Sequence, residues 1–220
     1  MTTLMPLALV RKIDYALLDP LLARREIEAG CAAAVQYDCF SVIVSPYYVE
    51  FARKLLKDTG VKTASVVGFP HGGVTTASKM YETQDMVQRG ADEIYMVLNL
   101  GALRDREDLL VHNDIATVVR TARGRPITVI LESALLNDEE KQRACKIADA
   151  AGAAFIQTST GFGPEDTTPE EVRYLRACPR VQVKAAGGID SLKEAMTMLE
   201  AGAARVIITQ ELERIASGAI

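Results

Sequence analysis

The sequence predicts an α/β protein folded as a single (β/α)8 TIM barrel that spans residues 1–220. Short apolar runs recur along the chain, and amphipathic segments with helix-capping chemistry separate them. The apolar runs are nearly continuous rather than alternating, which is typical of parallel strands covered by helices on both faces. Strand–helix units of roughly 25 residues each fit one closed barrel.

The expected strands are short apolar runs that end near Gly, Pro, Ser, Thr or Asn, as buried strands between turns do. In chain order they are IDYALL (13–18), SVIVSP (41–46), TASVVGFP (63–70), EIYMVLNL (93–100), ITVILES (127–133), FIQTST (155–160), VQVKAAG (181–187) and RVIIT (205–209). Their number matches the strands of the barrel.

The segments between these strands carry helix start and stop signals. Pro169 suits a first helical position, since proline has no amide hydrogen to leave unpaired there. A capping box is a Ser, Thr or Asn followed three residues later by Glu. The boxes are Asn137–Glu140, Thr168–Glu171 and Ser191–Glu194. Glycines that can take a left-handed conformation are expected to end helices at positions 30, 60, 90, 152 and 202.

A doubly wound open sheet is the alternative fold. No GxGxxG motif follows the first strand, so a dinucleotide site has little support. The fragments RGADEIYMV, AGAAFIQTS and AGAARVIIT each read as helix end, small residue and strand. This repeated unit favours the barrel.

The charge and hydropathy of the chain point to a small-molecule partner. A net charge of −4 and a pI near 5.4 give no long-range attraction for nucleic acid or anionic lipid. No apolar run approaches the roughly 20 residues of a membrane span, and the start of the chain has no basic region typical of a signal peptide. We expect a cytoplasmic protein.

No metal or cofactor is expected. The four cysteines form no CxxC pair, and the chain has only two histidines, which argues against a zinc cluster. Cys145 lies in a helical pattern beside alanines, where a buried reduced thiol is the simpler interpretation.

Chemistry in a (β/α)8 barrel takes place at the carboxyl ends of the strands, and polar residues gather there in this sequence. Lys184 in VQVKAAGG is expected inside the barrel or at its mouth. Burial would lower its pKa and make it an amine nucleophile. The alternative is a structural ion pair with a carboxylate such as Glu132.

Two further signals are weaker. His71 in GFPHGG follows a strand, where it would be a general acid or base or would only bond loop backbone. Gly187 and Gly188 precede a capped helix, where backbone amides would meet an anion or form an ordinary turn.

Several motifs in order resemble the deoxyribose-phosphate aldolase family: GFPHGGVTTASKMYET, GADEIYMVLNLGAL, ILESALLNDEEKQRACKIADAAGAAFIQTSTGF and VKAAGGIDSLKEA. The likeness runs from KIDYALLDP to AGAARVIIT. It implies one (β/α)8 barrel, a homodimer, and reversible cleavage of 2-deoxyribose 5-phosphate to glyceraldehyde 3-phosphate and acetaldehyde through a lysine Schiff base, without metal.

The same resemblance places Gln157 where the family has its Schiff-base lysine, directly before TSTG, and Tyr95 where it has its catalytic aspartate. A primary amide cannot form an imine, and tyrosine is a poor base near neutral pH. The family's second lysine matches Lys184. In the phosphate region, Asp190 and Glu211 would repel a phosphate, and Glu165 and Asp166 replace glycines.

The leading hypothesis is an aldolase-like lyase with an altered site that acts on a small, unphosphorylated carbonyl or sugar-like substrate. Lys184 would be a relocated Schiff-base amine or an electrostatic stabiliser, Tyr95 a proton donor, and Glu132 or His71 an acid or base. Gln157 and Asn99 would donate hydrogen bonds, and substrate-binding positions would include Thr158, Ser159, Gly161, Gly187 and Gly188. The alternatives are a cyclase, isomerase or dehydratase without an imine, and a catalytically inactive binding or regulatory protein.

Overall fold

A computed structural model describes residues 7–177, 180–209 and 212 of the chain. Its strands form one closed parallel barrel in sequence order, in which β1 pairs with both β2 and β8. This closure confirms the predicted (β/α)8 barrel and excludes the open doubly wound sheet. The strands are β1 Ile13–Leu17, β2 Ser41–Val44, β3 Lys62–Val67, β4 Glu93–Val97, β5 Ile127–Ile130, β6 Phe155–Gln157, β7 Gln182–Ala185 and β8 Arg205–Ile208.

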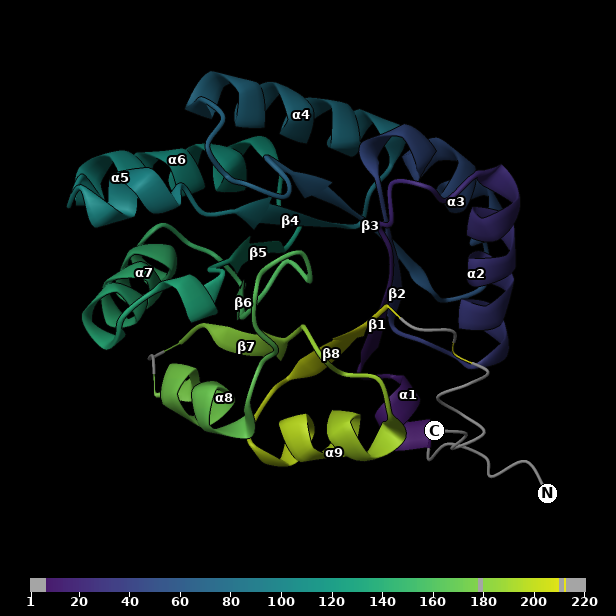
Figure 1. Cartoon of the computed structure of the whole chain (residues 1–220). Coiled ribbons are helices and arrows are strands. Elements are labelled where there is room, and N and C mark those ends of the chain that lie inside the picture. Colours follow the sequence, from purple (N-terminus) through teal and green to yellow (C-terminus); the bar gives the residue numbers. More distant parts are fainter. Residues whose placement is uncertain (1–6, 178–179, 210–211, 213–220) are drawn as a thin grey trace.

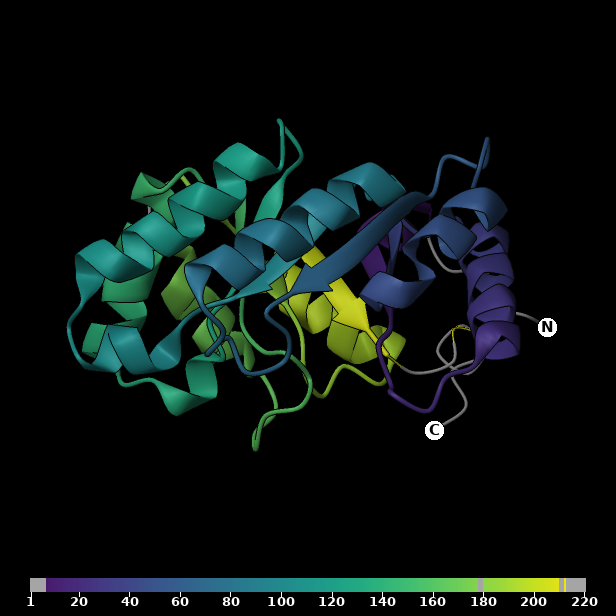
Figure 2. The same cartoon turned by 90° about the horizontal axis from the view of Figure 1, so that it is seen from above.

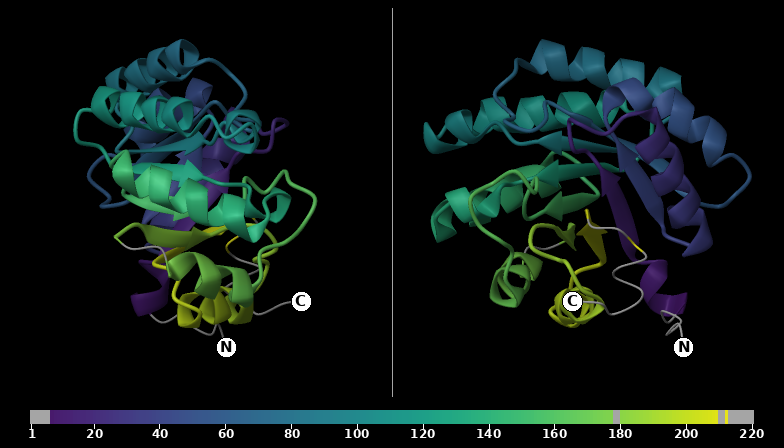
Figure 3. Two further views of the ribbon diagram at one scale, coloured as in Figure 1. Left: turned by 90° about the vertical axis from the view of Figure 1, so that its left-hand side faces the viewer. Right: turned by 45° about the vertical axis from the view of Figure 1, so that its right-hand side comes forward.

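Helices surround the barrel, as Figure 1 shows and the views in Figures 2 and 3 confirm. They are α1 Leu7–Val10, α2 Arg24–Gln36, α3 Val49–Leu55, α4 Thr76–Arg89, α5 Leu100–Arg104, α6 Asp108–Thr121, α7 Asp138–Ala150, α8 Pro169–Arg176 and α9 Leu192–Glu200, with short 3-10 turns at Pro46–Tyr48 and Ser133–Leu135. The main hydrophobic core lies between this ring and the strands. Because the helices bury the outer strand faces, the strands carry continuous apolar runs.

The predicted helix starts are confirmed. Side chains of Asn137, Thr168 and Ser191 each accept a hydrogen bond from the backbone N–H three residues later. One predicted helix end is wrong, because Gly30 lies inside α2. There a Cβ atom would lie 2.5 Å from a methyl group of Leu17, so glycine lets α2 approach β1.

The described cysteines are buried thiols. Cys31, Cys39 and Cys145 are all buried, and burial raises the pKa of Cys31 and Cys39 to about 12. Cys178 lies outside the described residues. The described part of the chain has no helix long and apolar enough to cross a membrane, and no group of three His, Cys, Asp or Glu side chains able to hold a metal ion.

Candidate active site

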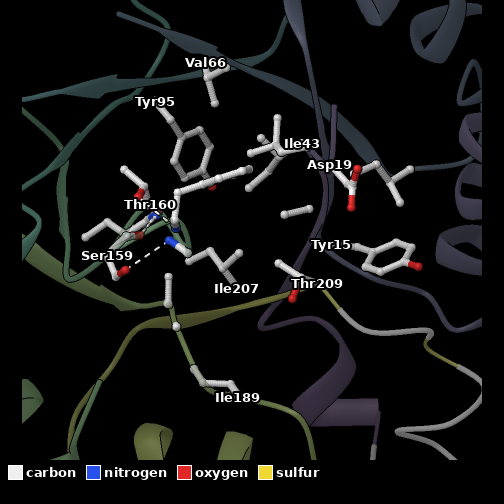
Figure 4. A pocket seen from close by; sticks show the side chains of 18 of the residues that line it. Tyr15, Asp19, Ile43, Val66, Tyr95, Ser159, Thr160, Ile189, Ile207 and Thr209 are labelled. Carbon is white, nitrogen blue, oxygen red and sulfur yellow. Dashed lines mark hydrogen bonds between the residues drawn. The ribbon is translucent and has the colours of Figure 1, made fainter. Parts of the chain in front are cut away.

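A cavity of about 650 Å³ opens at the carboxyl ends of the strands. Its wall comes from the ends of the strands and from the loops after β1, β6 and β7 (Figure 4). Apolar side chains, among them Ile43, Val66 and Ile207, form much of this wall. The position is the one where (β/α)8 enzymes carry out their chemistry.

Gln157, the last residue of β6, forms part of the cavity wall and is only 4% exposed. Its Nε2 donates to the backbone oxygen of Ser159 over 2.6 Å, and this acceptor fixes the orientation of the amide. Its Oε1 has no hydrogen-bond donor among the described residues. A buried acceptor without a partner costs free energy.

Glu132 holds the loop after β6 in place. It has a left-handed backbone with φ of 47° and is 5% exposed. Its carboxylate accepts hydrogen bonds from Ser159 Oγ, the backbone N–H of Thr160 and Thr160 Oγ1. Glu132 is not part of the cavity wall, so its placement does not support the predicted acid–base role, and its contacts indicate that it positions this loop.

Replacing Glu132 with glutamine should loosen residues 159–163, all of which contribute to the cavity wall. We expect a loss of about 1–3 kcal/mol in the free energy of unfolding, because an amide cannot accept every hydrogen bond that the carboxylate takes. Hydrogen exchange at the amide of Thr160, followed by mass spectrometry, should accelerate in the variant. An unchanged exchange rate would contradict the positioning role. Glu170→Gln, at an exposed helix start, is the control.

Lys184 lies in a buried ionic cluster, which we define as Asp14, Glu93, Lys184 and Arg205. Lys184 is 0% exposed, and its Nζ lies 3.1 Å from Glu93 Oε2 and 3.3 Å from Asp14 Oδ2. Arg205 pairs with Asp14 at 3.0 Å and with Glu93 at 2.8 Å. Two cations thus balance two carboxylates inside the barrel.

This cluster corrects the sequence analysis in two respects. The acidic partners of Lys184 are Asp14 and Glu93 rather than Glu132. Lys184 is also fully buried and absent from the cavity wall, which does not support its predicted role as an amine nucleophile. Burial lowers the pKa of Lys184, while the neighbouring carboxylates act in the opposite direction. A lowered pKa alone does not expose the amine to a carbonyl carbon.

Tyr95 links the ionic cluster to the cavity. Its hydroxyl donates to Asp14 Oδ2 over 2.9 Å and accepts from Lys184 Nζ over 2.5 Å. The residue is 1% exposed, its ring packs in the apolar cluster inside the barrel, and Tyr95 forms part of the cavity wall (Figure 4). The side chain therefore lies between the cavity and Lys184. Burial, reinforced by Asp14 and Glu93, raises the pKa of Tyr95 well above its usual value, so it stays a neutral phenol.

A family model described as DeoC/LacD family aldolase matches residues 14–219. The chain belongs to this aldolase family. A deoxyribose-phosphate aldolase of Thermococcus kodakarensis is 44% identical over 204 residues, covering 90% of this chain and 91% of the relative. One of Bdellovibrio bacteriovorus is 42% identical over 214 residues, covering 96% and 97%.

Solved structures agree with this aldolase assignment. The one described as QR15, an aldolase, is 40% identical with a TM-score of 0.90 and covers 94% of each chain. A tetrameric deoxyribose phosphate aldolase from Aeropyrum pernix is 28% identical with a TM-score of 0.89, covering 96% of this chain and 91% of that one. The barrel is thus the aldolase barrel of the family.

Some of the other predicted site residues belong to the cavity wall, and some do not. Ser159, Gly161, Gly187 and Gly188 join Tyr95 and Gln157 in the cavity wall, but His71, Asn99 and Thr158 do not. The predicted substrate contacts of these three residues are therefore not supported.

Each of those three side chains has another environment. His71 is exposed in the loop after β3. The side chain of Asn99 caps α5 by accepting from the backbone N–H of Ala102. Thr158 is buried, and its hydroxyl donates to the backbone oxygen of Ala186, which ties β6 to β7.

Sequence reasoning missed the acidic members of the ionic cluster as partners of Lys184. Glu93 stands two residues before Tyr95 on β4, so the two side chains share the inner face of the barrel. That spacing was available as a signal. It also missed Asp19 and Glu26, two carboxylates that contribute to the cavity wall from the β1–α2 segment.

Proposed function

We propose that this chain catalyses aldol-type carbon–carbon chemistry on a small, unphosphorylated carbonyl compound without forming a Schiff base. The observation that carries the proposal is the placement of Lys184 in the ionic cluster, with Tyr95 between its amine and the cavity. Among the described residues, no lysine belongs to the cavity wall. The role left for Lys184 is that of an electrostatic stabiliser.

The resemblance to the aldolase family supports this proposal. From the resemblance of the motifs, we take Gln157 to stand at the position of the family's Schiff-base lysine and Tyr95 at that of its catalytic aspartate. An amide nitrogen does not condense with a carbonyl, so the position that would carry the imine provides only hydrogen bonding. Gln157 and Tyr95 both belong to the cavity wall, where a substrate would meet them.

The proposed reaction uses Tyr95 as a neutral hydrogen-bond donor to the substrate carbonyl oxygen. In the cleavage direction, the β-hydroxyl gives its proton to solvent water and its oxygen becomes a carbonyl as the bond between the α and β carbons breaks. The electron pair of that bond forms an enolate, to which solvent water later returns a proton. In the free protein the hydroxyl of Tyr95 donates to Asp14. With substrate bound it donates to the substrate oxygen instead, and so it stabilises the developing oxyanion. Lys184, hydrogen-bonded to the phenol oxygen, opposes the negative charge there. Protonation of the enolate at its α carbon completes cleavage.

The absence of phosphate from the proposed substrate rests on charge. Among the described residues, no lysine or arginine belongs to the cavity wall, while Glu165 and Asp166 do. Carboxylates repel a phosphate dianion, and phosphate sites in proteins usually present cations or converging amides. Asp190 is exposed and not part of the wall, and Glu211 lies outside the described residues.

A turnover assay tests the proposed function. We expect retro-aldol cleavage of at least one unphosphorylated β-hydroxy aldehyde or ketone in a panel, and no cleavage of 2-deoxyribose 5-phosphate. Cleavage of the phosphate ester with inactivation by borohydride would contradict the proposal and indicate the ordinary family reaction. Binding without turnover of any panel member would contradict it in favour of an inactive binding protein.

One alternative has support from a specific contact. The pair of Tyr95 and Lys184, with an oxygen–nitrogen distance of 2.5 Å, also suits proton transfer in a cyclase, isomerase or dehydratase. Such an enzyme would rearrange a carbonyl substrate without breaking a carbon–carbon bond. We also propose that the protein is a homodimer and that it is located in the cytoplasm.

A further inference from the structure

We infer that Glu82, a residue of α4 outside the cavity, is a positioning residue: it holds the turn of residues 68–72 so that Phe69 keeps a fixed place in the cavity wall. This inference rests on the proposed function, because it takes the cavity as the place where a carbonyl compound binds. It adds a residue that shapes the cavity without touching the ligand.

Phe69 is a part of the cavity wall that this turn supplies. Its ring is half-buried and packs against the apolar cluster inside the barrel, to which Tyr95 also belongs. The ring meets that of Phe162 edge to face, with centroids 5.5 Å apart, and Phe162 belongs to the wall as well. Since β3 and β6 are three strands apart in the barrel, this contact joins two loops from different sides of the cavity mouth. The position of Phe69 therefore limits the space that a ligand has there.

The turn that carries Phe69 is tightly closed. The N–H of Gly72 donates to the backbone oxygen of Gly68 over 2.8 Å, and both glycines are left-handed, with φ of 70° and 62°. A Cβ atom on Gly72 would lie 2.0 Å from the backbone oxygen of Leu98, so the turn lies directly against the residue that follows β4. Both positions require glycine, because a side chain would strain the backbone and meet a neighbour.

Two residues on one face of α4 hold Gly68. Lys79 and Glu82 are three positions apart and so lie on the same side of the helix. Glu82 Oε2 accepts from the N–H of Gly68 over 2.7 Å. A Cβ atom on Gly68 would lie 2.9 Å from Cε of Lys79, so the lysine side chain packs against this glycine. The first residue of the turn is thus fixed by a charge-assisted hydrogen bond and by close packing.

Lys79 anchors this face of α4 to the barrel. It is 0% exposed, and its Nζ donates to Asp114 Oδ2 over 2.5 Å and to the backbone oxygen of Val97 over 2.9 Å. These contacts join α4 to α6 and to the end of β4. Among the described residues, Lys79 is the one ion-pair partner of the buried Asp114, so its removal would leave a buried charge unpaired. Glu82 is only half-buried and is therefore the residue to vary.

Two ketones that differ in one terminal group report on Phe69. They are 4-phenylbutan-2-one and pentan-2-one, in which a methyl group replaces the phenyl ring. Titration followed by NMR should show that the wild-type protein binds the phenyl ketone about tenfold more tightly, because the ring adds apolar area and an aromatic contact. Phe69→Ala should reduce this preference to about twofold, since the aromatic contact is lost.

Variants of Glu82 test its role. Glu82→Ala removes the acceptor of the Gly68 N–H and should lower the preference to about threefold, with the affinity for pentan-2-one unchanged. Glu82→Asp, which is one methylene shorter, should show the same loss. Glu82→Gln should restore the preference, because its amide oxygen can still accept this hydrogen bond. Gln84→Ala, at an exposed position of the same helix, is the control and should behave as the wild type.

A double-mutant cycle separates positioning from a general structural role. In the Phe69→Ala background, Glu82→Ala should change neither affinity, because the side chain through which it acts is gone. The inference would be overturned by equal binding of both ketones to the wild type, by no binding of either, by an unchanged preference in Glu82→Ala, or by an equal effect of Glu82→Ala with and without Phe69. Neither ketone has the β-hydroxyl group that cleavage requires. A protein that gives the expected cycle but cleaves no carbonyl compound would therefore contradict only the proposed function.

Discussion

Replacing Lys184 with methionine should lower the free energy of unfolding by about 3–5 kcal/mol, the usual cost of removing one partner from a buried ion pair. The ionic cluster would retain Asp14 and Glu93 with only Arg205 to balance them. Both carboxylates lie in the barrel interior, where water cannot replace the lost ammonium group. Urea unfolding followed by circular dichroism measures the effect.

The matched control for this variant is Lys193→Met, at an exposed position on α9. It should change stability by no more than about 0.5 kcal/mol, as surface substitutions usually do. A Lys184→Met protein as stable as the wild type would show that the ionic cluster does not hold the barrel interior together.

Replacing Tyr95 with phenylalanine should lower kcat by about 10²–10⁴-fold, the usual contribution of a positioned proton donor. The phenyl ring keeps its place in the apolar cluster, but the contact with the substrate carbonyl disappears, and Lys184 loses its link to the reacting oxygen. KM should change little, because the shape of the cavity is retained. Steady-state kinetics on the active member of the carbonyl panel would measure both parameters.

Tyr81→Phe removes an exposed hydroxyl from α4 and serves as the control, with wild-type kinetics expected. Full activity in Tyr95→Phe would remove Tyr95 from the mechanism. A rise in KM at constant kcat would assign it a binding role only.

The fold could be predicted from the sequence because parallel strands and their helices leave local signals. Continuous apolar runs such as ITVILES and SVIVSP reflect strands covered on both faces. A helix cap can be recognised from residues close together in the sequence, as with Asn137 and Glu140. Gly30 was misread because a glycine that admits a neighbouring strand looks the same, in sequence, as one that ends a helix.

The candidate site could be predicted only in part, since its contacts join distant strands. Lys184 was correctly expected inside the barrel, but its partners lie 170 and 91 positions earlier in the chain, at Asp14 and Glu93 (184 − 14 and 184 − 93). Likewise, the sequence around Glu132 does not show whether its carboxylate holds a loop or faces a substrate. Its three hydrogen-bond donors lie on the loop after β6, and only the pairing of β5 with β6 brings that loop beside Glu132.

Borohydride trapping tests the central claim most directly, namely that the reaction proceeds without an imine because Lys184 is enclosed. The protein is treated with sodium borohydride and an active carbonyl substrate, then its intact mass and peptides are measured. Gln157→Lys serves as the positive control, because an amine introduced into the cavity wall should be trapped. We predict an adduct at position 157 of that variant and an unchanged wild-type mass. A reduced adduct on Lys184 of the wild-type protein would contradict the account.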